Sequence, residues 1–223
     1  TKLAEGQRLD VALFHIGTSD EIVVASSSGG RTVYTNAGKT RRSGLELTHS
    51  AQWSPEWRSH IALSTLNASF AEAFSSGTAT VAKGNRIPGI ANRSLFGEIA
   101  WQPRALPGFT AALEAVHRGA MVVDDVNSDR TAAATLFNLR LGWEQKLGAW
   151  KLREYLRVDN LADRVTVGSV IANDGNRRFL AAAKAAGVEV ATQARAVETA
   201  IGPFAGLVFC FTVAMSTSSP AGV

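Results

Sequence analysis

The chain has 223 residues, enough for one large domain or two small ones, and a net charge of +4. The basic residues form no cluster, so the charge does not indicate a nucleic-acid partner. The single cysteine, Cys210, excludes an internal disulfide, and the four histidines lack the spacing of a metal site. Charged residues make up only 19%, which is low for a soluble protein.

From residue 8 to about 160 the hydrophobic period is two, which is the period of a β-strand. In 137–143, for example, the odd positions hold Phe, Leu, Leu and Trp, and the even positions hold Asn, Arg and Gly. Strands built this way form a sheet with one apolar and one polar face. Seven strands are predicted, over residues 7–25, 32–53, 58–71, 92–102, 108–120, 132–145 and 149–160, and an eighth is expected near Arg177.

A sheet of this kind suits either a soluble sandwich or an outer-membrane barrel, and the tryptophans favour the barrel. All five lie beside three short connections, at 53–57, 101–108 and 143–150. Membrane barrels gather aromatic side chains at the water interface. The remaining connections are mostly longer and polar or glycine-rich, which is typical of external loops.

Three places fit this pattern badly. His49 and Glu154 fall on the apolar face, where a charged group in mid-bilayer costs a few kcal/mol. Either a bulge changes the register there or both residues lie near an interface. In 58–71 the apolar residues are divided between the two faces, with Leu66 and Phe70 on the polar one.

Two short motifs resemble known binding loops but lack essential residues. Gly38-Lys39-Thr40 resembles the end of a phosphate-binding loop, but Val33 stands where the loop needs a glycine. Residues 125–129 have the spacing that opens a calcium loop, but Arg130 and Leu136 replace its glycine and its last acid. With no nucleophile elbow and no zinc motif, neither a catalytic nor a metal site is predicted.

Several segments, taken in order and spacing, resemble the late barrel strands of TonB-dependent outer-membrane receptors. They are Asn36–Glu46, Gly84–Ile90, Gly119–Asn127, Val158–Arg164 and Gly168–Ile171. The resemblance covers residues 5–180. It implies an all-β fold of antiparallel transmembrane strands, about 7–8 of a ~22-stranded barrel. It also implies a bacterial outer-membrane location, contact with lipid, no cofactor, and uptake of a ferric siderophore or other metal chelate.

In this family, energy for transport comes through the TonB protein, which pulls on a plug inside the barrel. Binding of TonB would therefore belong to an N-terminal part outside this chain, which begins without a methionine. Ligand contacts are expected in the external loops, 72–91 and 120–131 especially. Charged residues on the polar face are expected to line the lumen and to pair with one another and with the plug: Glu46, Glu98, Glu114, Arg118, Arg140, Glu144, Arg153 and Arg157.

The end of the chain departs from the family pattern. Residues 1–179 are expected to form barrel and residues 180–223 a divergent tail, helical or disordered. Within it, 180–186 is alanine-rich, 187–193 resembles a remnant closing strand, and 200–215 is an apolar run shorter than a spanning helix. Two alternatives stay open: a stand-alone small barrel with a structural or adhesive role, and a non-functional truncated receptor.

Overall fold

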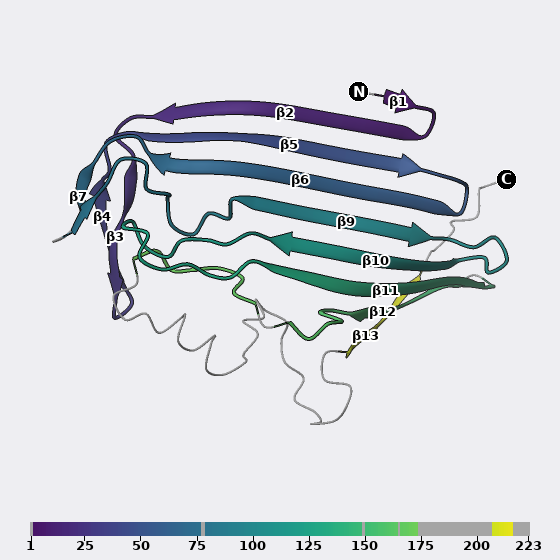
Figure 1. The fold of residues 1–223 in the computed structure, drawn as a ribbon. Helices are drawn as coiled ribbons and strands as arrows, with labels where there is room; N and C mark the ends of the chain where they lie inside the picture. Colours follow the sequence, from purple (N-terminus) through teal and green to yellow (C-terminus); the bar gives the residue numbers. More distant parts are fainter. Residues whose placement is uncertain (1, 77–78, 149, 165, 174–206, 216–223) are drawn as a thin grey trace, which may run out of the picture.

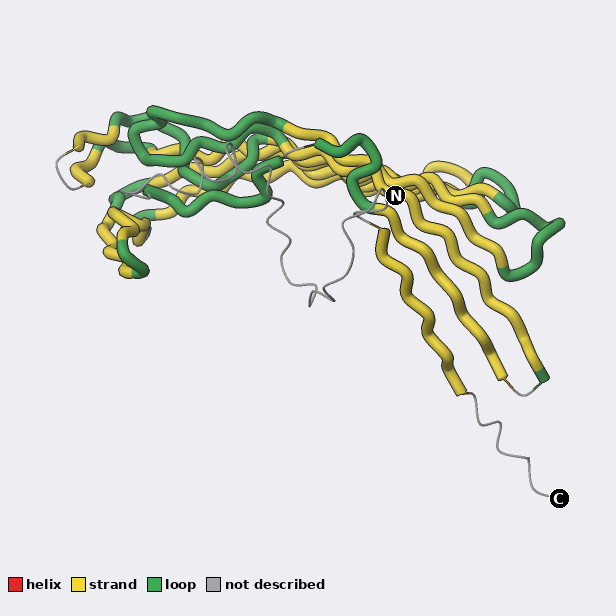
Figure 2. The backbone as a smooth tube through the Cα atoms, turned by 90° about the horizontal axis from the view of Figure 1, so that it is seen from below, coloured by secondary structure: helices red, strands yellow, loops and turns green. Residues whose placement is uncertain are grey.

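The computed structural model describes residues 2–76, 79–148, 150–164, 166–173 and 207–215, and it is built from β-strands joined by turns and loops (Figure 1). Nine strands form one antiparallel sheet in the order β1-β2-β5-β6-β9-β10-β11-β12-β13. These strands are β1 (Lys2–Ala4), β2 (Gln7–Thr18), β5 (Thr40–Gln52), β6 (Trp57–Phe70), β9 (Arg93–Trp101), β10 (Phe109–Arg118), β11 (Ala134–Leu147), β12 (Trp150–Val158) and β13 (Leu207–Met215). Figure 2 shows that the sheet bends rather than lying flat.

Five of the seven predicted strands agree with the structure to within a few residues, whereas the first two are divided. The predicted 7–25 becomes β2 and β3 (Ile22–Ser28), and the predicted 32–53 becomes β4 (Arg31–Asn36) and β5. Strands β3 and β4 pair only with each other and form a separate hairpin, which lies across the direction of the main strands (Figure 1). A second small hairpin joins β7 (Phe74–Ser76) to β8 (Ala79–Val81).

Left-handed backbone conformations interrupt both long strands. Asp20 has φ 55° and Gly38 has φ 69°, and neither value belongs to an extended strand. The two breaks face each other, because the Glu21 amide donates to the Gly38 carbonyl and the Ala37 amide donates to the Glu21 carbonyl. The hairpin therefore leaves the main sheet at a single hydrogen-bonded crossing.

The register confirms one apolar and one polar face in the main sheet. Pairing Trp57 with Trp101 and Phe109 with Trp143 brings aromatic residues of four strands to the same face and the same end. Their rings form a continuous aromatic row (Trp57, Trp101, Phe109 and Trp143), with successive centroids 5.9, 6.3 and 6.2 Å apart. This row marks the end of the sheet that carries the short turns.

No bulge moves His49 or Glu154 to the polar face, because the strand pairing continues without a register shift through both residues. Instead both lie near the short-turn end. Glu154 pairs directly with Trp143, and the His49 ring lies 6.2 Å from that of Trp53. Of the two explanations considered, the position near an interface is the one that the structure supports.

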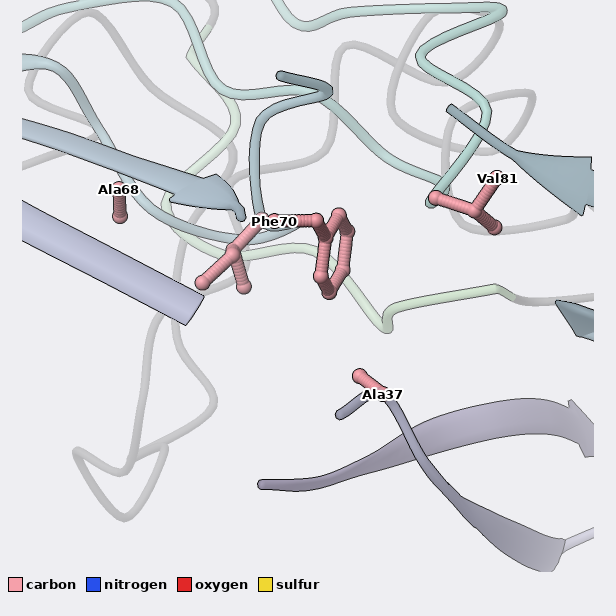
Figure 3. Packing of buried hydrophobic residues seen from close by; sticks show 5 residues of the cluster. Ala37, Ala68, Phe70 and Val81 are labelled. Carbon is pink, nitrogen blue, oxygen red and sulfur yellow. The ribbon is translucent and has the colours of Figure 1, made fainter. Parts of the chain in front are cut away.

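The irregular apolar pattern of 58–71 has a different cause. At the far end of β6, Phe70 is 1% exposed and lies in a cluster with Ala37, Ala68, Val81 and Ile87 (Figure 3). Figure 3 shows Ala37 below the Phe70 ring and Val81 to its right. Here the polar face is covered by the loops, so its side chains form a small core.

Part of the expected tail is a strand. Residues 207–215, within the apolar run 200–215, form β13 and pair antiparallel with β12, Leu207 opposite Val158 and Met215 opposite Trp150. The expected helix at 180–186, the expected strand remnant at 187–193 and the expected strand start at Arg177 lie outside the described residues. No helix in the described ranges is long and apolar enough to cross a membrane.

Candidate ligand-facing surface

A network of charges crosses the polar face of the main sheet. Its members are Glu98, Glu114, Arg140 and Arg157. Arg140 Nη2 lies 2.6 Å from Glu98 Oε2, and its Nη1 lies 3.4 Å from Glu114 Oε1. Arg157 Nη2 lies 2.9 Å from Glu114 Oε2 and completes the chain of pairs.

The register explains why two carboxylates come together. Glu98 and Glu114 are direct cross-strand partners, an arrangement that is repulsive on its own. Arg140 bridges them from β11, and Asn138 donates a 3.4 Å hydrogen bond to Glu114. Glu114 is only 5% exposed, so its charge depends on these donors.

The remaining predicted charges behave differently from one another. Glu144 joins Lys151 at 2.7 Å and Arg153 at 2.6 Å, near the short-turn end. Glu46 and Arg118 are both exposed and line one hollow of about 280 Å³. Neither of these two makes an ion pair with any residue that the structure describes. All eight predicted residues share the polar face, and six of them form ion pairs within the described part of the chain.

A wider hollow of about 700 Å³ opens on the same face toward the short-turn end. Arg58, His60 and Glu98 line it together with Arg8 and Ser50. His60 Nδ1 lies 2.9 Å from Ser50 Oγ, so that ring is held in place by its neighbour on β5.

At the opposite end, the loops 72–91 and 120–131 pack together instead of standing apart. The Arg86 amide donates to Asn127 Oδ1 at 2.8 Å, and Asn127 Nδ2 donates back to the Arg86 carbonyl at 2.9 Å. Asn85 Nδ2 donates to the Asp125 carbonyl at 2.8 Å. The two loops expected to contact ligand therefore form one unit.

Asn173 ties this unit to β3. Its side chain bonds the amide and the carboxylate of Asp125, while its Nδ2 also donates to the Val24 carbonyl in β3. Its backbone accepts from Ser27 and donates to Val123. We call this assembly of β3, 72–91, 120–131 and Asn173 the external loop layer.

Sequence reasoning did not single out Asn127 and Asn173, although a signal was present. Both adopt positive φ, 59° and 52°, a conformation that asparagine tolerates better than most residues. An asparagine in a loop is therefore a candidate for a turn whose side chain bonds neighbouring backbone.

Two carboxyl groups, one in this layer and one just before β3, have pKa values that are shifted in opposite directions. Burial raises the pKa of Asp125, although the Asn173 hydrogen bond opposes the shift. Hydrogen bonds from Arg42 and Thr40 lower the pKa of Glu21 against the effect of burial. Arg42 Nη1 lies 2.8 Å from Glu21 Oε2, and it anchors the β3 segment to β5.

The residues that give 125–129 its calcium-like spacing form hydrogen bonds within the loops. Asp125 accepts a hydrogen bond from Asn173, and Asn127 accepts one from the Arg86 amide. Asp129 accepts from the Arg130 amide. Within the part of the chain that the structure describes, no three His, Cys, Asp or Glu side chains come together as metal ligands would.

An antiparallel sheet with an apolar outer face, an aromatic row at the short turns and longer loops at the other end defines a wall of an outer-membrane β-barrel. Residues 2–195 match the family described as TonB dependent receptor-like, beta-barrel. The chain therefore belongs to this outer-membrane family, whose members are transporters rather than enzymes. The match continues beyond the residues 5–180 in which the resemblance was placed.

Solved receptors share the fold at low sequence identity. The siderophore receptor PiuA from Acinetobacter baumannii has a TM-score of 0.58 and 15% identity, covering 75% of this chain and 24% of the receptor. The ferric yersiniabactin uptake receptor FyuA from Yersinia pestis gives 0.54 and 22%, covering 72% and 23%. The ferric preacinetobactin receptor BauA from Acinetobacter baumannii gives 0.59 and 11%, covering 75% and 26%. The chain thus spans about a quarter of the length of the receptors it matches.

Proposed function

We propose that this chain forms part of the wall of an energy-coupled outer-membrane transporter, with a ferric siderophore or a similar metal chelate as its cargo. The observation that carries the proposal is the match of residues 2–195 to the receptor barrel family. The family implies a TonB partner and a ligand, and three structural neighbours are named for siderophores or their iron complexes.

The geometry supports a role in a larger barrel. Across the described strands the order runs from β1 to β13 without closing on itself. An open sheet leaves unpaired edges, which lipid does not tolerate. Joining further strands resolves this, so we favour a segment of a large barrel over a stand-alone small one.

On this proposal the polar face lines the lumen. The charge network would stiffen the wall where a plug moves, and the hollow lined by Arg58, His60 and Glu98 would receive a polar surface of that plug. The external loop layer would offer the first contacts to cargo, because the loops 72–91 and 120–131 are already joined there.

Uptake by living cells tests the cargo. The gene that encodes the parent protein is deleted, and entry of a radioactive ferric siderophore is compared with entry of cobalamin and of an oligosaccharide. We expect loss of ferric siderophore uptake alone, restored by the intact gene and abolished again without TonB. Unchanged iron uptake together with loss of another nutrient would replace the proposed cargo, and TonB-independent uptake would contradict the energy coupling.

A further inference from the structure

A hollow of about 350 Å³ lies at the loop end of the main sheet, between β10, β11 and the segment that follows β12. His117, Thr135, Phe137 and Arg164 line it together with three alanines. His117, Thr135 and Phe137 pair within the same face as the aromatic row, so the hollow opens on the lipid-facing side and not on the polar face.

Its height places the hollow at the upper membrane surface. Strand β10 takes nine residues from Phe109 to His117, and strand β11 takes nine from Trp143 to Thr135. A tilted transmembrane β-strand needs about 9–11 residues to cross the bilayer. Since the aromatic row marks the lower boundary, His117 and Thr135 stand at the upper one, where lipid headgroups begin.

Arg164 is held at this level by its backbone. Asn160 Oδ1 accepts from the Arg164 amide at 2.9 Å, and Asn160 Nδ2 donates to the Arg164 carbonyl at 3.1 Å. The Leu161 amide donates to the Phe137 carbonyl at 2.7 Å, which fixes the segment against β11. The guanidinium itself belongs to an exposed residue.

Other polar groups near Arg164 also favour an anionic ligand. His117 Nδ1 lies 2.9 Å from Thr135 Oγ1. When the hydroxyl donates to Nδ1, the imidazole carries its hydrogen on Nε2, a donor for an anionic oxygen. Arg93, exposed on the same face of β9 one row above, adds a second positive charge. Asp163 is the one acidic neighbour in the segment 160–164.

We propose that this hollow binds the phosphate of an anionic lipid headgroup in the outer leaflet. An arginine fork matches phosphate geometry, and Phe137 below it supplies an apolar floor for the adjoining acyl chains. The proposal rests on the membrane position of the sheet and is independent of the cargo.

Native mass spectrometry of the full-length parent protein in detergent tests the proposal, with phosphorylated lipid A and enzymatically dephosphorylated lipid A as probes. We expect preferential retention of the phosphorylated lipid and about tenfold weaker retention after Arg164→Gln. Arg31→Gln, which removes the same charge at the tip of the β3–β4 hairpin, should bind like the wild type. Heat-modifiable migration in gels confirms that each variant is folded.

Two further variants test the contribution of charge to lipid binding. Arg164→Lys keeps the charge and should bind better than Arg164→Gln, whereas Asp163→Asn should bind more tightly than the wild type. Equal retention of the two lipids, wild-type binding by Arg164→Gln, or displacement of the lipid by millimolar inorganic phosphate would each overturn the proposal, the last by identifying free phosphate as the ligand.

Discussion

Asn173 and Asp125 hydrogen-bond to each other twice across 48 positions of the chain: the Asn173 Nδ2 donates to Asp125 Oδ2 at 2.7 Å, and the Asp125 amide donates to Asn173 Oδ1 at 2.9 Å. This pair joins loop 120–131 to the segment that ends at residue 173. Through Asn173 it also reaches β3. The external loop layer is therefore held by side-chain amides together with isolated backbone hydrogen bonds.

Removing that amide should loosen the layer without disturbing the wall. In the parent protein, Asn173→Ala should raise the mobility of a spin label at Val126, while a label at Leu139 keeps its spectrum. The reason is that a buried carboxylate and several backbone groups lose their partner, at a cost of about 1–3 kcal/mol. Equal mobility at Val126 in variant and wild type would show that Asn173 does not hold the layer.

The same label should report a pH dependence. Because burial raises the pKa of Asp125 above its ordinary value of 3.8, its stabilising contribution is fully present below 3.8 and is lost as pH rises through the raised pKa. Label mobility should increase over that window, and Asp125→Asn should abolish the transition. Glu21 has the opposite sign: its contribution is present above 4.5 and is lost only as pH falls through its lowered pKa.

The charge network should contribute measurably to barrel stability. Glu114→Gln leaves Arg140 and Arg157 facing each other near a buried site, so unfolding in urea should become easier by about 1–3 kcal/mol, a value reduced because both arginines are partly exposed. Glu144→Gln, in a more exposed cluster, should have a smaller effect. A double-mutant cycle of Glu114 and Arg157 measures their coupling, and additive effects would show that the pair is not coupled.

Gly44 should not tolerate a side chain. A Cβ there would collide with the Thr65 carbonyl oxygen and lie 2.6 Å from Phe14 Cζ, whereas a Cβ at Gly97 would meet nothing within 4 Å. Gly44→Ala should therefore destabilise the barrel by about 1–3 kcal/mol, and Gly97→Ala should be nearly neutral. Urea unfolding of both variants gives the comparison, and equal midpoints would argue against close packing at Gly44.

The orientation of the wall can be measured directly. Spin labels at Leu139 and Leu141 in the reconstituted parent protein should be accessible to oxygen, which concentrates in hydrocarbon. Labels at Thr110 and Tyr155, on the opposite face, should respond more to a water-soluble nickel reagent. The reverse result would place the polar face in lipid and reject the proposed lumen.

Most strands of the wall could be predicted because one face is apolar over most of their length, so the two-residue period is visible in the sequence. Asp20 and Gly38 escaped prediction although the alternation fails at both breaks, since residues 18–21 and 39–43 are runs of polar side chains. Phe70 looked irregular because its core is completed by loop residues such as Val81 and Ile87. The charge network could not be predicted without the strand register, because no local pattern shows that Glu98 lies opposite Glu114.

The crossing formed by Glu21, Ala37 and Gly38 has a practical consequence. The β3–β4 hairpin pairs with neither neighbour in the main sheet, and a Cβ at Gly29 or Gly30 at its tip would meet nothing within 4 Å. A foreign peptide spliced between these two glycines should therefore be presented to the surrounding medium while the wall assembles as before. The hairpin is a natural place to display an epitope on the surface of a bacterium.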